Sequence, residues 1–287
     1  MALVYPGEEL DIQPGISAVV FAPPGPAELD TAILDLAAVL DGLVFDNFEI
    51  VMVEAGPSQR ISDLVAELGL RFPHLPLRLL EGDYADHAAA LSAAFGSATF
   101  DLIFVTSADG RYDVRELNHL LEAIEQGADL VIGYRPKRAD SFAARLDGWG
   151  WNLLINLVFG PTARDVDCAF KLFRQNVWQR VDMRSRGTAT FYTELLVRAR
   201  RLGFRVTELP VSHHRAATLV PTASPATIWR ALADLIEVRK GVDDDYSTTL
   251  RSLRRRRCST SHLGGRPRRG PSSSHSIGSV RRSTIST

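Results

Sequence analysis

The chain has 287 residues, of which 45% are hydrophobic and 23% charged, and its formal net charge is −1. This balance excludes a wholly disordered, collagen-like or multi-span membrane chain, and the length suffices for one large α/β domain or two small ones. The charge is unevenly spread, because residues 251–287 contain ten arginines and no acid. An acidic body of net charge −11 therefore precedes a tail of charge +10.

The chain carries no sequence signal for export. Its two cysteines, Cys168 and Cys258, provide neither a disulfide framework nor the spacing of a metal finger. The first 14 residues are acidic and lack a basic start followed by an apolar run, so no signal peptide is visible. The longest apolar run, 149–159, is shorter than the roughly 20 residues that cross a bilayer. We expect a cytoplasmic protein, with peripheral contact at the inner face of the cell membrane as an open alternative.

Short β-rich runs alternate with helical patterns along the first half of the chain. Strands are predicted over residues 16–22, 48–53, 76–80, 102–106 and 129–133. Apolar residues at spacings of three and four predict helices over 29–40, 61–70, 84–97 and 113–124. Asp113, with Glu116 three residues later, resembles a capping pair that opens the last of these helices. The alternation predicts βαβ units and a mostly parallel sheet covered by helices on both faces.

The second half has a different pattern. Residues 140–159 are aromatic and amphipathic, and form either part of the core or a helix lying on a membrane surface. Strands are predicted over 168–173 and 204–209, with helices over 191–202 and from Ser224-Pro225 to Gly241. Beyond Arg251 large apolar residues are almost absent, so we expect disorder. The predicted organisation is an N-terminal extension (1–15), one α/β domain (16–242), and an acidic linker with an Arg/Ser-rich tail (243–287).

Several common nucleotide and hydrolase motifs are missing. No G-x-G-x-x-G follows the first predicted strand, and no G-x-x-x-x-G-K-[ST], H-E-x-x-H or G-x-S-x-G occurs. These absences argue against nucleotide-cofactor redox chemistry, a P-loop and a nucleophile elbow. Because ligands of parallel sheets bind beyond the carboxyl ends of the strands, the informative residues directly follow the strands, at 23–26, 54–58 and 107–111.

Five segments together resemble the family-two glycosyltransferases of GT-A fold, specifically the dolichyl- or polyprenyl-phosphate sugar transferase branch. They are FEIVMVEAG (48–56), FVTSADG (104–110), ADLVIGYR (128–135), RDVDCAFKLF (164–173) and ELPVSHHR (208–215). The resemblance covers about residues 16–240 and implies a Rossmann-like GT-A fold. It also implies transfer of a hexose, with inversion, from a UDP- or GDP-linked nucleotide-sugar to a polyprenyl-phosphate acceptor, with Mg²⁺ or Mn²⁺ as the cofactor.

The resemblance places the donor site on residues that follow the strands. The family's D-x-D motif falls on Ser107-Ala108-Asp109, so Asp109 is the one carboxylate left for a metal, and Arg111 stands where relatives often carry Gln. The further donor-binding positions are Pro23, Glu54, Gly56 and Arg135. Relatives usually show two Asp before the Gly after the second strand, where this chain has Glu54 and Ala55. They also commonly follow the first strand with an Asn-Glu pair, where this chain has Pro24-Gly25-Pro26, so three donor elements differ from the family's pattern. We expect a weak or dispensable metal, with Arg111 supplying positive charge to the diphosphate.

The phosphate-handling positions are better preserved. By resemblance, the acceptor and phosphate groups would contact Arg135, Arg138, Arg145, Asp165 and Arg215. Glu194 lies in the segment that supplies an acid facing the acceptor, so the candidate catalytic residues are Asp109, Glu194 and Arg215. A phosphate acceptor is already anionic near neutral pH and needs no strong base. Catalysis then reduces to positioning and to stabilising the leaving diphosphate.

Each candidate also has a purely structural interpretation. Asp109 would cap a helix, Glu54 would be a solvated loop acid, and the three arginines would form a solvated basic face. His213 and His214 would orient a loop, and Cys168 would be a small buried hydrophobe. The altered donor positions leave a second function open, that of a catalytically silent glycosyltransferase-like protein that binds a sugar-nucleotide weakly or only a partner.

The Arg-rich tail has three interpretations. It holds the acidic body against anionic lipid, at about 1 kcal/mol per basic residue near the surface. It contacts nucleic acid, although no folded RNA- or DNA-binding motif accompanies it. Or it has no function, since the composition switches abruptly after Leu250. We rank the last slightly ahead of the first and expect no nucleic-acid partner.

Overall fold

The computed structural model describes residues 13–22, 29–43, 47–53, 59–82, 84, 86–136, 142–184, 188–214 and 232–244. All of them belong to one compact unit, Met1–Asp245. The N-terminal extension to residue 12 and the tail from residue 245 lie outside the described residues, so the predicted domain boundaries remain predictions.

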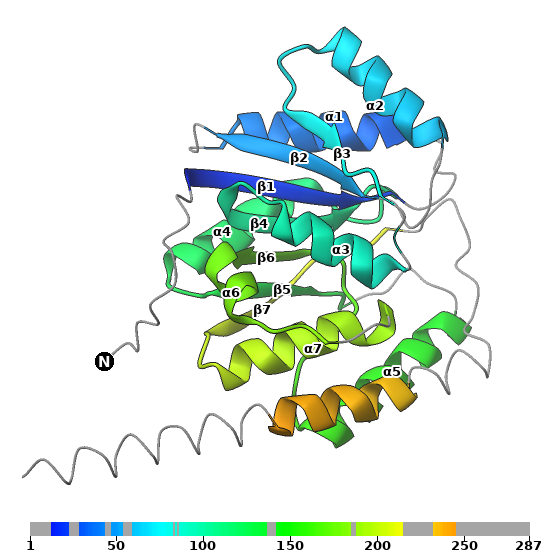
Figure 1. Cartoon of the computed structure of the whole chain (residues 1–287), viewed down its shortest axis with the longest axis vertical. Coiled ribbons are helices and arrows are strands. Elements are labelled where there is room, and N and C mark those ends of the chain that lie inside the picture. The colour runs from blue at the N-terminus through cyan, green and yellow to red at the C-terminus, as the bar shows by residue number, and fades with distance from the viewer. Residues whose placement is uncertain are drawn as a thin grey trace, which may run out of the picture. The chain divides into compact units, whose positions relative to one another are not determined.

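Seven strands form one sheet in the order β3-β2-β1-β4-β6-β5-β7 (Figure 1). Their bounds are β1 (Gln13–Phe21), β2 (Phe48–Val53), β3 (Leu77–Leu79), β4 (Phe100–Ser107), β5 (Leu130–Tyr134), β6 (Lys171–Arg174) and β7 (Val206–Pro210). Five helices come before β6, together with one 3₁₀ turn: α1 (Leu29–Asp41), α2 (Gln59–Arg71), α3 (His87–Gly96), η1 (Val114–Glu116), α4 (Leu117–Glu125) and α5 (Phe142–Phe159). α6 (Gln175–Arg180) and α7 (Thr188–Arg201) follow β6, and a last helix spans 232–244.

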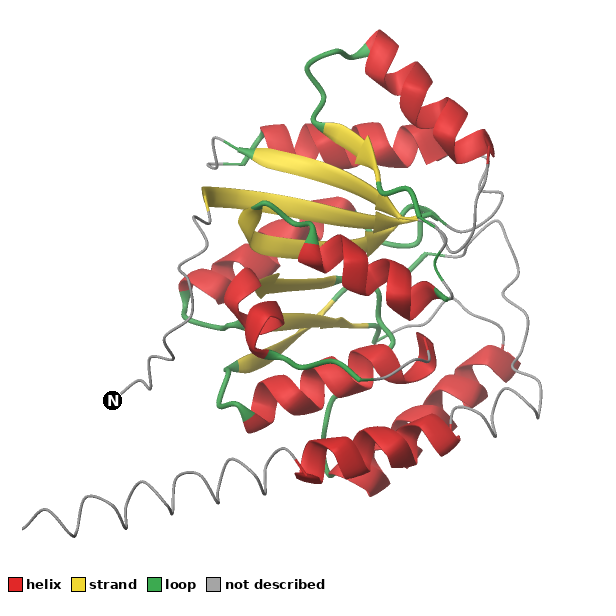
Figure 2. Ribbon diagram, in the orientation of Figure 1, coloured by secondary structure: helices red, strands yellow, loops and turns green. Residues whose placement is uncertain are grey.

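The sheet is mostly parallel, as the sequence predicts. β1 pairs in parallel with β2 and β4, β2 pairs with β3, and β5 pairs with β7. Only β6, among the described strands, runs antiparallel to its neighbours β4 and β5. The carboxyl ends of β1, β2 and β4 therefore meet at one edge (Figure 2), and the turn that enters β6 reaches this same edge.

Helices cover both faces of the sheet because successive strand residues point to opposite sides. Ala18 packs in a core with α1, α2 and α4, whereas its neighbour Val19 packs in a second core with α3, α5, α6, α7 and the 232–244 helix. In Figure 1 the two helices flanking β1, α1 and α3, lie on opposite sides of the sheet. The α/β class with helices on both faces is confirmed.

Individual elements agree with the sequence prediction to different degrees. Within the aromatic, amphipathic 140–159 segment, Phe142–Phe159 forms the long helix α5. The Asp113 side chain caps η1 by accepting from the Arg115 amide at 3.1 Å. Glu116 completes no capping box, because its carboxylate instead accepts from the Ser212 amide at 2.8 Å. The short helix α6 was not predicted, since six residues are too few for a periodicity signal.

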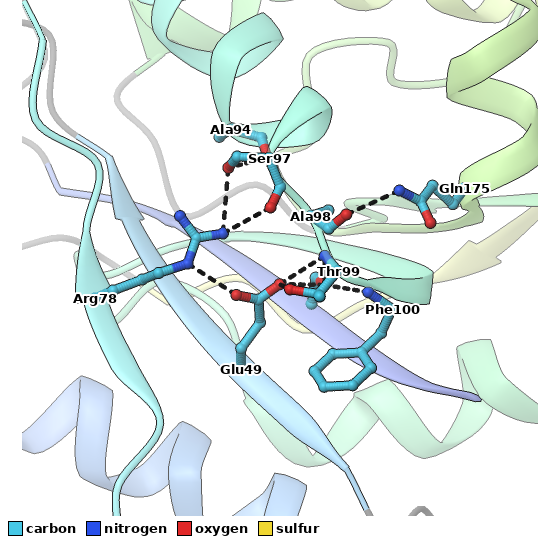
Figure 3. Close-up of polar contacts among 9 residues, drawn as sticks. Glu49, Arg78, Ala94, Ser97, Ala98, Thr99, Phe100 and Gln175 are labelled. Carbon is cyan, nitrogen blue, oxygen red and sulfur yellow. Dashed lines mark hydrogen bonds and ion pairs between the residues drawn. The ribbon is translucent and has the colours of Figure 1, made fainter. Parts of the chain in front are cut away.

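A polar network closes the amino-terminal edge of the sheet (Figure 3). The nearly buried carboxylate of Glu49 on β2 accepts from Ser17 Oγ at 2.7 Å, from Arg78 Nε at 2.8 Å, and from Thr99 N and Oγ1 at 2.8 and 2.6 Å. Arg78 also donates to the carbonyl of Ser97 at the end of α3. Burial alone would raise the pKa of Glu49, but the bonds from Arg78, Thr99 and Ser17 outweigh it and lower that pKa. The network joins β1, β2, β3 and α3.

Candidate functional site

Asp109 and Arg111 lie just past the end of β4. Ser107 is the last residue of β4 and pairs with Phe21 of β1, and Gly110 turns the chain with a φ of +70°. Asp109 Oδ1 accepts from the Arg111 amide at 3.2 Å, and Oδ2 lies 2.9 Å from Arg111 Nε. The two side chains are 14% and 16% exposed. Asp109 is therefore held by an arginine two residues away, at the edge of the sheet where ligands of such folds bind.

Tyr112 fastens this loop to two other segments. Its buried hydroxyl accepts from the Ala169 amide at 3.2 Å, and its ring packs against Phe170 and His213 with centroids 5.6 and 5.5 Å apart. Burial raises the pKa of Tyr112 well above its usual value, so the hydroxyl stays neutral. No sequence pattern marks Tyr112 as a site residue, although it stands only three residues after Asp109.

The segment that follows β7 lies against the same loop. The His214 amide donates to the carbonyl of Arg111 at 2.8 Å, and the Val211 amide donates to the carbonyl of Tyr134 at 2.9 Å. These contacts agree with the interpretation of the two histidines as loop-orienting residues. A cavity of about 520 Å³ opens here, within the usual size of ligand pockets. It is lined by Glu116, Pro136, Pro210, Val211, Ser212, His213 and His214.

Arg135 and Asp165 form a buried bidentate ion pair beside this cavity. Arg135 Nε lies 2.5 Å from Asp165 Oδ2, Nη2 lies 2.7 Å from Oδ1, and the two side chains are 6% and 7% exposed. Burial alone would lower the pKa of Arg135, but Asp165 outweighs it and raises that pKa further. Tyr112 also interacts electrostatically with Arg135. Asp109, Arg111, Arg135 and Asp165 thus lie at one edge of the sheet, the edge of the carboxyl ends of β4 and β5. The guanidinium group of Arg135 donates both of these hydrogen bonds to Asp165.

Glu194 has a different environment from the one that the resemblance implies. It is fully buried in α7, where its carboxylate accepts from Arg198 Nε at 2.6 Å and from the Arg184 amide at 3.0 and 3.1 Å. These contacts tie α7 to residues 181–184. The geometry supports a structural role, and a catalytic role for Glu194 stays a prediction.

Several predicted site residues lie outside the described part of the chain. They are Pro23, Glu54, Gly56, Arg138 and Arg215, together with the side chain of Arg145. Their convergence on Asp109 and Arg135 remains a prediction. Cys168 is buried, as expected.

The described residues do not fit a tight divalent-metal site. Mg²⁺ and Mn²⁺ prefer several hard oxygen ligands. Among the residues that the structure describes, no group of three or more His, Cys, Asp or Glu side chains could hold a metal ion. Asp109 is the predicted ligand that is described, and both of its oxygens already contact Arg111.

The outer face of α5 is apolar. Trp149, Leu153 and Leu157 recur every four residues, lie on one face of the helix, and are 64%, 44% and 74% exposed. Burial is described for residues 148–159 of α5, and the remaining exposed residue in that range is Gly150. No helix within the described ranges is long and apolar enough to pass through a bilayer.

Comparison with known proteins identifies the family. Residues 27–181 match the family model described as "Glycosyl transferase family 2", and the chain belongs to this family. It is 30% identical over 168 residues to the undecaprenyl-phosphate 4-deoxy-4-formamido-L-arabinose transferase of Edwardsiella ictaluri, covering 58% of this chain and 50% of that protein. It is 32% identical over 175 residues to the glycosyltransferase AglD of Haloferax volcanii, covering 58% and 27%. The chain thus spans half or less of the length of these two curated relatives.

Solved structures share the fold. Glucosyl-3-phosphoglycerate synthase from Mycobacterium tuberculosis superposes with a TM-score of 0.57 at 14% identity, covering 79% of this chain and 80% of that one. Mannosyl-3-phosphoglycerate synthase from Rubrobacter xylanophilus gives a TM-score of 0.56 at 13% identity, covering 90% and 77%. These likenesses confirm the GT-A architecture. The first enzyme has also been crystallised with Mn²⁺ and UDP.

Proposed function

We propose that this protein transfers a hexose from a UDP- or GDP-linked donor to a polyprenyl-phosphate acceptor, with inversion at the anomeric carbon. The observation that carries the proposal is the position of Asp109 and Arg111 at the carboxyl end of β4, within the segment that matches family 2. The name of one relative supports the acceptor class, since that protein is an undecaprenyl-phosphate sugar transferase. The proposal does not choose between a UDP-linked and a GDP-linked donor, and it does not specify which hexose is transferred.

The reaction is a single displacement. A phosphate oxygen of the acceptor attacks the anomeric carbon, the bond from this carbon to the diphosphate breaks, and the electron pair leaves on the β-phosphate oxygen. The acceptor is anionic near neutral pH, so no residue needs to remove a proton. The protein's contribution is to align the two substrates and to place positive charge where the leaving group gains negative charge.

Arg111 is the residue best placed to supply that charge among the described side chains. It is 16% exposed at the strand edge and is oriented by Asp109. A guanidinium can donate two parallel hydrogen bonds to a phosphate. Asp109 then serves mainly to orient Arg111, and Arg138, Arg145 and Arg215 are proposed to contribute further positive charge. The poor fit to a divalent cation leads us to expect transfer that does not require Mg²⁺ or Mn²⁺.

The apolar face of α5 supports peripheral attachment to the membrane that holds such an acceptor. Trp149, Leu153 and Leu157 would bury their side chains in the interfacial region of the bilayer, where tryptophan is favoured. α5 is the next element along the chain after β5, whose end carries Arg135. This arrangement would present the site to a lipid-linked phosphate.

Transfer from radiolabelled UDP- and GDP-hexoses to a polyprenyl phosphate tests the proposal. Arg111→Ala is expected to lower kcat/KM by about 10²-fold or more, the usual loss for one preorganised donor to a developing oxyanion. Arg115→Ala is the matched control and should retain activity, because Arg115 is an exposed arginine four residues away whose hydrogen bonds use its backbone atoms. EDTA should leave the wild-type rate unchanged. The proposal would be contradicted if EDTA abolished transfer by the wild type and the Arg111→Ala variant kept the wild-type rate.

The same assay can present the acceptor in two ways. Leu157→Ser is expected to slow transfer to a long-chain acceptor in anionic vesicles and to leave transfer to a short, water-soluble acceptor unchanged. An equal effect on both acceptors would contradict the role of α5.

The pairing of Asp109 with Arg111, together with Ser107 in place of a carboxylate, also favours a second candidate function, that of a catalytically silent binding protein. Calorimetry with UDP- and GDP-sugars, with and without Mn²⁺, separates the two. Binding with slow hydrolysis favours the transferase, whereas no heat from any donor favours the silent relative.

A further inference from the structure

Lys171 is a fully buried lysine in the middle of the sheet. It begins β6, pairs with Val105 of β4 and Ile132 of β5, and is 0% exposed. Both neighbours pack in the apolar core on the α7 side of the sheet. A lysine at such a position costs stability unless its ammonium group is compensated. A residue that is unfavourable for packing invites the question of what its charge does.

The ammonium group has two defined partners. Lys171 Nζ donates to the carbonyl of Cys168, and it lies 3.9 Å from the centroid of the Tyr192 ring on α7. The charged and titratable groups around it are Asp165, Asp167 and Cys168 on the preceding turn and Arg135 at the end of β5. Burial lowers the pKa of Lys171 to about 8, so the group is mostly charged at pH 7. Burial also raises the pKa of Cys168 and that of Tyr192, so both stay neutral there.

The turn that Lys171 holds is the common support of two parts of the site. Asp165, at its start, forms the ion pair with Arg135 and also accepts from the Arg135 amide at 3.3 Å. Ala169, at its end, donates to the hydroxyl of Tyr112, which lies next to Arg111. One turn thus fixes both the loop after β4 and the end of β5.

We propose that Lys171 is a positioning residue, whose charged ammonium group holds the Asp165–Ala169 turn and thereby keeps Arg111 and Arg135 in place. Loss of its proton would leave a neutral amine with a weaker hydrogen bond to Cys168 and no cation to lie over Tyr192. The turn would then loosen, and the two arginine segments with it. The inference concerns the site of the proposed transferase, but its main test needs no transfer activity.

Hydrogen exchange of the full chain, followed by mass spectrometry, tests the proposal. The reporters are the amides of Ala169 and Arg135, which bond Tyr112 and Asp165, and the amide of His214, which bonds the carbonyl of Arg111. Lys171→Met is expected to lower protection of all three at least tenfold at pH 7, while amides of β2, on the far side of β1, keep theirs. Unchanged protection, or loss confined to Ala169, would overturn the proposal.

Two further measurements separate the charge from simple packing. Lys171→Met removes a buried charge at similar volume, so its free energy of unfolding should equal or exceed that of the wild type even while the three amides open. In the wild type the protection should fall as the pH rises through about 8. A wild-type profile that stays flat from pH 6.5 to 9.5 would also overturn the proposal.

Tyr192 supplies a matched pair of variants if Lys171→Met does not fold. Tyr192→Phe keeps the ring under the ammonium group and should keep the midpoint of this transition, whereas Tyr192→Leu removes the ring and should move it to lower pH by about half a unit or more. Equal midpoints would overturn the role of the ring. If the protein transfers sugar, its rate should fall with the same midpoint. If exchange behaves as stated and no sugar is transferred, only the proposed function fails.

Discussion

The two edges of the sheet carry similar chemistry in different settings. At the amino-terminal edge, the Glu49 carboxylate meets Arg78, Ser17 and Thr99, all of which come from strands or from residues directly adjoining them. At the carboxyl edge, Asp109 meets Arg111 and Asp165 meets Arg135, and these residues lie in loops and turns. Both edges pair a mostly buried carboxylate with an arginine.

The difference teaches that an Arg–carboxylate pair does not by itself mark a functional site. The Glu49 network uses both carboxylate oxygens to join neighbouring strands and α3, and Figure 3 shows its partners closing around it. The carboxyl-edge pairs instead belong to the segments that resemble a donor site, and Pro136, next to Arg135, lines a cavity of about 520 Å³. Substitutions at the two edges should therefore separate stability from activity.

The largest effect on stability is expected from breaking the Arg135–Asp165 pair. Asp165→Ala leaves a buried guanidinium without its main partner and should lower the free energy of unfolding by about 3–5 kcal/mol, measured by urea denaturation. The double variant Arg135→Met/Asp165→Leu removes both charges and should recover most of that loss while transfer stays low. If the double variant were as unstable as Asp165→Ala, the pair would contribute more than charge balance to the free energy of unfolding.

Glu194→Gln should give the next largest effect and sharpen the contrast within the predicted catalytic set. The variant keeps the shape of the side chain but weakens its bonds to Arg198 and the Arg184 amide, at a cost of about 2–3 kcal/mol. We expect unfolding to shift while kcat, measured well below the new melting temperature, changes less than threefold. A large fall in kcat with unchanged stability would restore the catalytic role that the resemblance implies.

The smallest effect is expected at the opposite edge. Glu49→Gln should lower the free energy of unfolding by about 1–2 kcal/mol and leave transfer unchanged. Because the folded-state pKa of Glu49 lies below the ordinary value of 4.5, the contribution of its ionised carboxylate to stability is complete above pH 4.5 and is lost as the pH falls through the folded-state pKa. Acid unfolding should therefore be less steep below pH 4.5 in Glu49→Gln than in the wild type. Identical acid profiles would contradict this assignment.

Much of the fold follows from local patterns in the sequence. The strands β1, β2, β4 and β5 are apolar runs of the expected length, and the mostly parallel sheet with two helical layers follows from their alternation with helices. The predicted residues that follow strands, such as Asp109 and Arg111, do lie at the carboxyl edge. The contacts between distant segments do not follow from such local patterns, because periodicity within one element does not reveal which loop meets which.

Asp165 was placed at the site by the family resemblance alone, and Lys171 was given no role. The rule that ligand-binding residues follow strands fails for β6, whose antiparallel direction brings the residues before it to the site edge. Lys171 lies within the RDVDCAFKLF segment (164–173), but its importance depends on its burial and on the ring of Tyr192, which comes from a helix distant in the sequence. Glu194 is the opposite case. Its segment matches the family's pattern, but its side chain is buried against Arg198 and the Arg184 amide.

The place of β6 in the sheet also has a consequence for how the chain folds during synthesis. β4 ends at Ser107, and the strand that covers its free side begins only at Lys171. Until the ribosome has released that later segment, β1 to β4 expose a long apolar strand edge, the kind of edge that pairs with other chains. This edge stays open while the residues of α5 are being made, so self-association of the emerging polypeptide is most favoured over that interval.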